Sequence, residues 1–350
     1  MGKQDADHLF SALREKYSIT IDWSGSSYLG FTLDWHYDAG YVDLSMPPFV
    51  PKALKKFGHE KPKVPQHAPH RWTRPDYGSK VQYAANDDSA PLDKPGTTRV
   101  QGVSGTFLWY GRALDSTILP ALNEISNNQA SPTVLTGKAC DHLLDYLATH
   151  PDAIIRFYAS DMILYVIADA AYLVLPQSRS RCAAIYFLSN QPTAVPPQPT
   201  HNGAVHVLCK TIRGVPASAS EAETGGLFLA AQDALPIITA LEELGHQQPP
   251  TGTPLETDNS TAHDILHAKV RMKRSKAFAM RYHWLKYRIA QQQFNLYWAL
   301  GKRNYSDYFT KHFPPSHHQL VRYDYLQRPQ ANAITSHLQG CVTLISSRST

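Results

Sequence analysis

The stretch Met162–Asp169, MILYVIAD, decides the fold predicted for this chain. Every residue before the final Asp169 is hydrophobic, as expected of a strand that is buried on both faces of a sheet. Two further runs with strand character follow at 183–188 and 205–212, and a proline-rich insert at 191–202 separates them. We therefore expect three consecutive strands in this part of the chain.

The chain after residue 212 alternates between helical and strand patterns. An apolar stripe with helical spacing covers 218–245, although Pro236 removes a backbone donor and is expected to kink or split that helix. The further predicted elements are a strand at 255–258, helices at 260–267 and 273–289, a strand at 294–299 and a helix at 306–313. This order indicates an α/β domain.

The first half of the chain predicts a hairpin and a helical module. Residues 28–46 alternate with a period of two, and Asp38-Ala39-Gly40 supplies the turn of a β-hairpin. A short helix is expected to end near Phe57. Residues 58–96 are rich in proline and charge and predict an irregular linker, whereas 97–152 has the apolar spacing of helices.

Length and composition limit the class of protein. With 350 residues and 43% hydrophobic content, the chain can form a substantial core. No apolar stretch approaches the roughly 20 residues of a membrane span, and the polar N-terminus predicts no secretion signal. The four cysteines are scattered without a CxxC pair, so we expect a reducing compartment, no disulfide partner and no thiolate zinc site. The formal charge of +5 is compatible with a phosphate-rich partner but does not require one.

Four acidic residues stand at the boundaries of different predicted elements. Asp169 ends the buried strand, Glu223 lies near the start of the long helix, Asp258 closes a short strand, and Asp307 opens the last helix. Carboxylates at the ends of separate elements can converge on one point, and Mg²⁺ prefers such oxygen ligands. Crowded carboxylates repel one another without a cation, so the pattern predicts a two-metal site suited to phosphodiester hydrolysis.

Local explanations compete with this interpretation. Asp169 can be a turn residue, and Asp258 can cap the helix that follows it, which weighs equally with a role as ligand. Asp307 can be an ordinary favourable charge at a helix start, and the local sequence favours that explanation.

Two overlapping capping boxes precede the long helix. One pairs Ser220 with Glu223, and the other pairs Ser218 with Glu221. We favour Glu221 as the capping residue, which leaves Glu223 to reach toward a neighbouring strand as a ligand.

The predicted helix at 273–289 is strongly basic opposite its apolar stripe. A phosphate-contacting face and a solvated helix surface explain this equally well. The candidate nucleic-acid-binding residues are Lys273, Arg274, Lys276 and Arg281.

The sequence motifs around the four acidic residues resemble those of a known family. Ile167–Tyr172 (IADAAY), Ala217–Glu223 (ASASEAE), Thr257–Ala262 (TDNSTA) and Asn304–Lys311 (NYSDYFTK) occur in this order. Together with Ser275–Leu285 (SKAFAMRYHWL), they resemble the ribonuclease H domain of copia-type LTR retrotransposon polyproteins. Each motif alone is weak, and the ordered set is specific.

The resemblance implies a fold, a site and a reaction. The fold would be the mixed ribonuclease H sheet flanked by helices. Asp169, Glu223, Asp258 and Asp307 would be catalytic residues that bind two Mg²⁺ ions, with Mn²⁺ as a substitute. The reaction would be hydrolysis of the RNA strand of an RNA–DNA hybrid.

The resemblance extends upstream of the sheet. The hairpin that follows Tyr28-Leu29-Gly30, together with Gly102–Tyr110 (GVSGTFLWY), looks like the end of a reverse transcriptase palm followed by its thumb and connection. The implied domains are a palm remnant at 1–57, a linker at 58–96, a thumb and connection at 97–152, ribonuclease H at 153–325 and a tail of uncertain role at 326–350. The implied partner is the missing polymerase half of the polyprotein, and the implied location is a cytoplasmic element particle or the nucleus.

Departures from the family pattern leave an alternative open. The polymerase Tyr-x-Asp-Asp hairpin is not in this sequence, so polymerase activity is not expected. Thr224 replaces an aromatic residue, Ser306 replaces a small alanine, and Pro236 lies within the helix that carries Glu223. The alternative function is a catalytically inactive, nucleic-acid-binding remnant of a degenerate retroelement.

Overall fold

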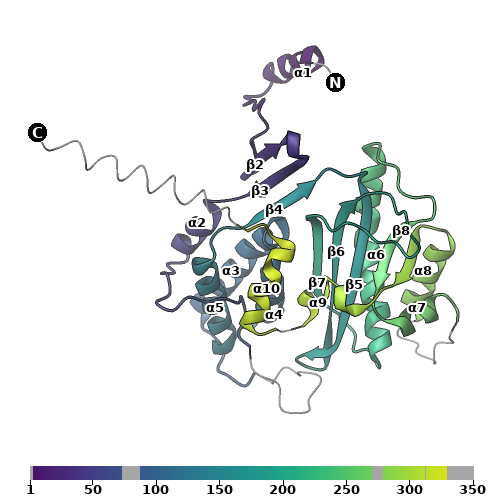
Figure 1. The fold of residues 1–350 in the computed structure, drawn as a ribbon. Coiled ribbons are helices and arrows are strands. Elements are labelled where there is room, and N and C mark those ends of the chain that lie inside the picture. Colours follow the sequence, from purple (N-terminus) through teal and green to yellow (C-terminus); the bar gives the residue numbers. More distant parts are fainter. Residues whose placement is uncertain (1–2, 73–86, 270–278, 312, 329–350) are drawn as a thin grey trace, which may run out of the picture.

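The computed structural model describes residues 3–72, 87–269, 279–311 and 313–328 (Figure 1). The helices that precede the large sheet are α1 (Lys3–Arg14), α2 (Phe49–Lys56), α3 (Lys94–Ala113), α4 (Leu119–Asn128) and α5 (Val134–Thr149). Those that follow its first strands are α6 (Ala219–Glu243), α7 (Ser260–Leu266), α8 (Ala279–Ala290), α9 (Asp307–Thr310) and α10 (Pro315–Tyr325). Short 3₁₀ turns occur at η1 (Tyr37–Ala39), η2 (Ser116–Ile118) and η3 (Gly301–Arg303).

A mixed sheet of five strands forms the centre of the α/β part. Its strands are β5 (Ile163–Leu175), β6 (Arg179–Ser189), β7 (Ala204–Thr211), β8 (Thr253–Thr257) and β9 (Phe294–Trp298). They are ordered β7-β6-β5-β8-β9. β5, β6 and β7 pair antiparallel, whereas β8 pairs parallel with both β5 and β9. The predicted mixed sheet is confirmed, as is the predicted succession of its strands and helices along the chain.

The central strand β5 is longer than predicted. Asp169 was expected at its end, which is wrong, because β5 continues to Leu175. The reason is that Ala170 and Ala171 still pair with β6, opposite Cys182 and Arg181. Asp169 therefore lies inside the strand that occupies the middle of the sheet.

One face of the sheet is covered by α6, α7 and α8 (Figure 1). Small residues of α6, including Ala230, Ala231 and Ala234, are fully buried against the sheet. α6 runs without interruption past Pro236, so the expected split of this helix does not occur. By length and composition α6 could also cross a membrane, a test that the core helices of soluble proteins pass as well.

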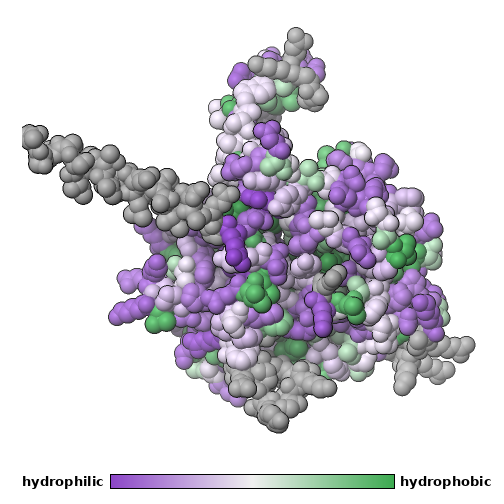
Figure 2. All heavy atoms as spheres, viewed as in Figure 1, coloured by the Kyte–Doolittle hydropathy of each residue, from purple (hydrophilic) through white to green (hydrophobic). Residues whose placement is uncertain are grey.

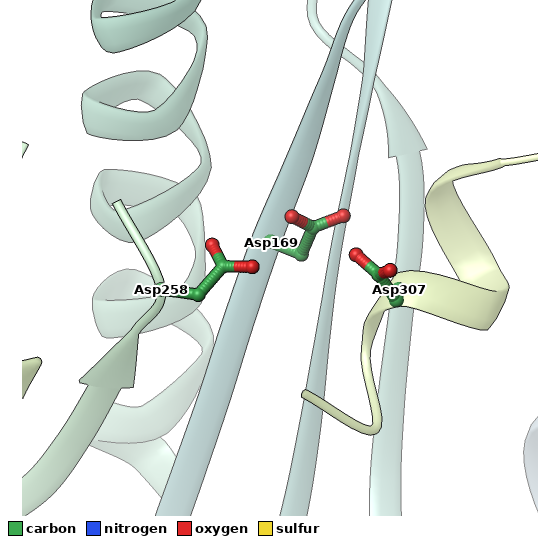
Figure 3. A group of neighbouring side chains, drawn as sticks. All are labelled: Asp169, Asp258 and Asp307. Atoms are coloured by element: carbon green, nitrogen blue, oxygen red, sulfur yellow. The ribbon is translucent and has the colours of Figure 1, made fainter. Parts of the chain in front are cut away.

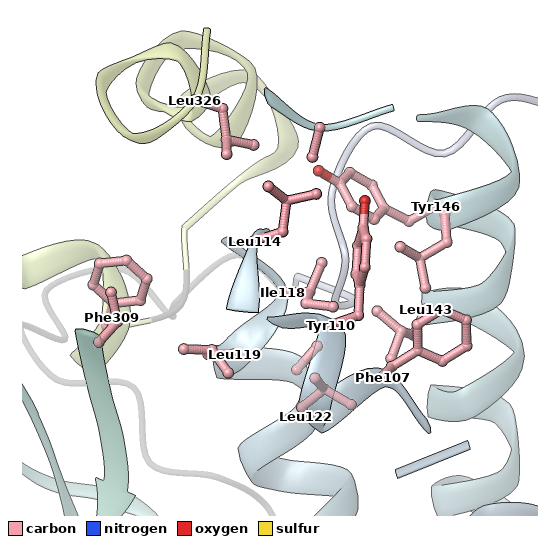
Figure 4. Close-up of a cluster of buried hydrophobic side chains, with 14 of the residues drawn as sticks. Phe107, Tyr110, Leu114, Ile118, Leu119, Leu122, Leu143, Tyr146, Phe309 and Leu326 are labelled. Atoms are coloured by element: carbon pink, nitrogen blue, oxygen red, sulfur yellow. The ribbon is translucent and has the colours of Figure 1, made fainter. Parts of the chain in front are cut away.

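The other face of the sheet shares one core with the helical module α3–α5 (Figure 4). Phe107, Tyr110 and Leu143 of the module belong to the same buried cluster as Tyr165 of β5 and Phe309 of α9. The module therefore packs directly against the side of the sheet that α6 leaves free.

A second sheet contains the predicted hairpin. Its strands are β1 (Ser27–Tyr28), β2 (Phe31–His36), β3 (Tyr41–Ser45) and β4 (Ile154–Tyr158), in that order and all antiparallel. β4 was not predicted, and it links this sheet to the chain just before β5. Arg156 of β4 donates two hydrogen bonds of 2.7 Å to the carboxylate of Asp43 on β3. The face seen in Figure 2 is largely hydrophilic, with scattered hydrophobic residues.

The last predicted helix is shorter than expected and is followed by another. α9 ends at Thr310, where Lys311 takes an extended conformation, and Pro314 and Pro315 follow soon after. Pro315 then occupies the first position of α10, where its missing N–H has no helical partner to lose. α10 was not predicted. Of the expected tail, only Leu326–Arg328 are described, and Leu326 is buried.

A buried polar network fastens α10 to the helical module. Arg322 donates to Asp115 (3.1 Å) and to the Tyr146 hydroxyl (2.9 Å), and all three residues are almost completely buried. Asp115 also accepts a hydrogen bond from the backbone N–H of Thr117 (3.1 Å). Each charged group in this network has a partner, as buried charges require.

Removing one member of the Asp115–Arg322 ion pair should destabilise the whole protein. We expect Asp115→Asn to lower the free energy of unfolding by about 3 kcal/mol, because it leaves the Arg322 guanidinium buried without its counter-charge. The double variant Asp115→Asn/Arg322→Met should recover most of that loss, since no buried charge remains. Denaturant titration of the two variants measures both values, and equal destabilisation in both would contradict the ion-pair explanation.

Candidate metal centre

Asp169 lies at the centre of the candidate site. It is only 3% exposed on β5, where it pairs with Ala183 of β6. The Thr310 hydroxyl of α9 donates a hydrogen bond to its carboxylate. The site thus begins with a buried carboxylate on the central strand of the sheet.

Asp258 comes beside Asp169 because of the parallel pairing of β5 with β8. Ala168 pairs with Thr257, the last residue of β8, so Asp169 and Asp258, which follow them, lie at the same level of the sheet. Asn259 caps α7 by accepting a hydrogen bond from Ala262 N–H (2.9 Å). The helix cap is therefore Asn259, and the Asp258 carboxylate is left for the site.

Asp307 approaches from the opposite side on α9. Its position depends on the turn before it, where the Asn304 side chain accepts from Ser306 N–H (3.0 Å) and donates to the Ala168 carbonyl (3.4 Å). The Lys311 ammonium, one helical turn later, contacts the Asp307 carboxylate and lies 4.0 Å from that of Asp169.

The three aspartates form a compact group. One carboxylate oxygen from each of Asp169, Asp258 and Asp307 lies within 4.8 Å of the other two. Figure 3 shows Asp169 between the other two carboxylates, which point toward it from β8 and α9. This donor set consists of hard oxygen ligands, the kind that Mg²⁺ and Mn²⁺ bind.

Glu223 is not a member of this group of three. It is 7% exposed on α6, and its pKa is raised well above the usual value, first by burial and then by the charges of Asp169 and Asp258. The predicted alternative at the helix start is resolved in favour of Glu221. Ser218 caps α6 by accepting from Glu221 N–H, and the Glu221 carboxylate accepts from Ala217 N–H (2.9 Å). Glu223 therefore has no capping role and lies near enough to the aspartates to interact with them electrostatically.

Burial and mutual repulsion disfavour the charged forms of these acids. Burial is the first cause that raises the pKa of Asp169 to about 7, and the charges of Asp307 and Asp258 add to it. The pKa of Asp258 is also raised, by burial and by Asp307. Burial alone would lower the pKa of Lys311, but Asp169 and Asp307 raise it overall. One ammonium thus faces several carboxylates, which leaves an excess of negative charge that a divalent cation would neutralise.

A glycine allows Asp258 to occupy its position. A Cβ atom on Gly301 would lie 2.7 Å from the Asp258 Oδ2 atom, closer than non-bonded atoms tolerate. The Trp298 indole N–H also donates to the Asp258 carbonyl (2.9 Å). The turn after β9 therefore sets the position of the Asp258 side chain.

The predicted nucleic-acid-binding residues are mostly not tested. Lys273, Arg274 and Lys276 lie outside the described residues. Arg281 is half-buried on α8, and its guanidinium lies 5.8 Å from the centre of the Phe228 ring. A phosphate-contacting role for these four residues stays a prediction.

Asn304, Thr310, Lys311 and Gly301 contribute to the site without having been predicted. The first three belong to the motif Asn304–Lys311, where only the aspartate was singled out. A signal was available, since polar residues three and four positions from Asp307 share its face of a helix. Gly301 gave no such signal, because its role follows from a contact with a distant strand.

Comparisons with known proteins give fold likenesses alone. Neither the protein-family models nor the curated proteins include a match to this sequence. The N-terminal RNase H domain of Rv2228c from Mycobacterium tuberculosis aligns over 47% of this chain and 97% of its own, with 14% identity and a TM-score of 0.30. LC11-RNase H1 from compost, in complex with an RNA/DNA hybrid, aligns over 41% and 91%, with 10% identity and a TM-score of 0.28. RNase H1 of Halobacterium salinarum aligns over 41% and 89%, with 14% identity and a TM-score of 0.25.

The raised pKa values make stability depend on pH in a defined direction. A carboxyl group with a raised pKa in the folded state stabilises the fold fully below its unfolded pKa of about 4, and this contribution is lost as pH rises through the folded value. For Asp169 the loss spans pH 4 to about 7. In EDTA, we expect the melting temperature of the wild type to fall between pH 5 and 8 by several degrees more than that of Asp169→Asn.

Divalent cations should act in the same pH window, because they bind the ionised carboxylates. Mg²⁺ or Mn²⁺ should raise the melting temperature of the wild type more at pH 8 than at pH 5, as measured by calorimetry. An equal rise in Asp169→Asn at pH 8 would show that the cation binds elsewhere.

Gly301→Ala should weaken metal binding without touching a carboxylate. The new methyl group would displace the Asp258 side chain, and we expect about a 10- to 100-fold loss of Mn²⁺ affinity, the range for residues that orient a ligand. Titration calorimetry with Mn²⁺ measures the loss. Gly105→Ala is the matched control, because a Cβ atom there meets nothing within 4 Å. Wild-type Mn²⁺ affinity in Gly301→Ala would refute the proposed contact.

Proposed function

We propose that this protein is a metal-dependent endoribonuclease of the ribonuclease H type, which hydrolyses the RNA strand of RNA–DNA hybrids. The observation that carries the proposal is the convergence of three aspartates: Asp169 within β5, Asp258 directly after β8 and Asp307 at the start of α9. The proposed reaction and the RNA–DNA hybrid as substrate are inferred from the sequence motifs around these residues.

The donor set suits two Mg²⁺ or Mn²⁺ ions. When bound, two such ions activate a water molecule and neutralise charge on the attacking and leaving oxygens of the phosphate. Asp169 lies between Asp258 and Asp307, so its carboxylate would be the ligand common to both sides of the site. Glu223, whose pKa the charges of Asp169 and Asp258 help to raise, would act as a further metal ligand or as a neighbouring charge.

The protein residues around the ligands fix their orientation. Thr310 holds one oxygen of Asp169, the turn at Asn304 positions the start of α9, and Gly301 leaves room for Asp258. Lys311 contributes positive charge beside Asp307, which reduces repulsion among the carboxylates. A preorganised site of this kind needs little rearrangement when a phosphate approaches.

The finer assignment is to a retroelement of the copia type. It is supported by the ordered motifs of the sheet domain and by the hairpin and helical module upstream, which would correspond to the end of a palm, a thumb and a connection. In this proposal the partners are the RNA–DNA hybrid and the polymerase half of the polyprotein. The protein acts in a cytoplasmic element particle or in the nucleus.

A cleavage assay on a labelled RNA–DNA hybrid tests the function. We expect Mg²⁺-dependent cutting of the RNA strand, and a loss of more than about 100-fold in each of Asp169→Asn, Asp258→Asn and Asp307→Asn. The loss should exceed the 10- to 100-fold effect of changing residues that only support a ligand. Asp88→Asn is the matched control, because Asp88 is exposed and outside the cluster.

The assay also separates the alternative function. Tight binding of the hybrid without cutting would favour an inactive, nucleic-acid-binding remnant. Cutting that persists in all three cluster variants would show that the activity does not come from this site.

A further inference from the structure

A groove lies beside the carboxylate cluster, at the edge of the large sheet. It has a volume of about 1260 Å³. The proline-rich segment 195–201 forms one wall, and β9 with the turn that follows it forms another. We call it the β9 groove, lined among others by Val195, Glu256, Trp298, Leu300, Lys302 and Tyr305.

The groove and the cluster share the same turn. Leu300 and Lys302 line the groove on either side of Gly301, and Gly301 is the residue whose backbone approaches the Asp258 carboxylate. Trp298, another lining residue, donates its indole N–H to the Asp258 carbonyl (2.9 Å). A substrate held at the carboxylates would therefore have the groove within reach of its neighbouring atoms.

The lining combines flat apolar surface with positive charge. Trp298 is 40% exposed and Leu300 is 67% exposed, so both offer apolar surface to a ligand. Lys302 is exposed on the same wall, and Lys269, also exposed, adds a second ammonium that lies 3.6 Å from Asp264. Base rings stack on aromatic side chains, and lysines attract the phosphates that join the bases.

One buried acid adds a polar group to this lining. Glu256 is 8% exposed, and its carboxylate accepts a hydrogen bond from the Tyr297 hydroxyl (2.9 Å). A carboxylate is an acceptor for the amino and imino groups on the edge of a base. The groove thus offers apolar surface to the faces of a nucleotide base, a carboxylate to the edge of that base and ammonium groups to the phosphates of the nucleic acid.

We propose that the β9 groove binds an unpaired nucleotide of the RNA strand, next to the phosphate that the cluster cleaves. This inference rests on the proposed function. A paired base cannot use the groove, because its ring faces are stacked and its edge is occupied by its partner. The protein therefore binds hybrids with a single-stranded RNA extension more tightly than blunt hybrids.

Fluorescence anisotropy in EDTA tests the proposal separately from catalysis. The probes are a fluorescein-labelled blunt RNA–DNA hybrid and the same hybrid with a single-stranded extension on either the RNA or the DNA strand. We expect the RNA extension to tighten binding about fivefold or more, the lower end of the effect of one base stacked on an aromatic ring. The DNA extension should give a smaller gain.

A double variant connects this gain to the groove. Leu300→Ala/Lys302→Ala should clearly reduce the gain from the RNA extension, because the apolar surface and the ammonium beside Trp298 are lost while Trp298 itself stays in place. It should also reduce the slope of log affinity against log salt by about 0.7, as expected for one lost phosphate contact to a single strand. The matched control is Leu244→Ala/Lys138→Ala, which removes an equally exposed leucine and an exposed lysine away from the groove.

Two outcomes overturn the inference. The first is an RNA extension that adds no affinity, and the second is a gain that is undiminished in the groove variant. Either result excludes a nucleotide in the groove and would favour a protein partner there. If the blunt hybrid is cut normally in Mg²⁺ while the extension adds nothing, this inference fails and the proposed function stands. If the extension tightens binding but no hybrid is cut, the proposed function fails instead.

Discussion

The carboxylate cluster depends on the packing of α9, a helix of only four residues. A helix this short is not stable alone, because isolated helices below about 12 residues are marginal in water. Its stability comes from Tyr308 and Phe309, which are buried in the core shared with the helical module. The Tyr308 hydroxyl donates to the Thr117 carbonyl (2.8 Å) and is hydrogen-bonded to His318 (2.6 Å). Asp307 directly precedes Tyr308, and it reaches the sheet because these contacts hold the helix in place.

The same packing that assembles the cluster makes it electrostatically unfavourable. Burial removes water from Asp169 and Glu223, and both pKa values rise in consequence. If the acids were free to move, repulsion would separate them. They stay together because Asp169 lies in β5, Asp258 directly follows its neighbour β8, and Asp307 belongs to a helix whose other residues are buried in the core. This stored repulsion would be released by a bound cation, so a loss of stability at the site is consistent with a binding function.

Sequence reasoning predicted the regular elements well and the long-range contacts poorly. The apolar run before Asp169 was enough to identify β5, because burial on both faces leaves no other pattern. The same reasoning failed for α10, since its buried residues, His318 and Arg322, are polar and four apart. Val321 and Tyr325 also pack against the core, but two half-buried residues are too short an apolar period to identify a helix. Polar residues that are buried through a network are indistinguishable in sequence from residues on a solvated surface.

The helical module has a structural role that its position in the sequence does not indicate. It precedes the large sheet and was predicted as a separate unit, yet its helices belong to the same buried cluster as Ile163, Tyr165 and Ile167 of β5. Arg322 and His318 of α10 then join this module to the end of the described chain, through Asp115 and Tyr146. Asp307 is therefore supported by residues before the sheet as well as by the Asn304 contact with β5, whereas Asp169 is supported by its pairing in the sheet and by Thr310 of α9. Because both aspartates are needed in one place, the site is a product of the contact between the two parts, and each part alone would lack a side of it.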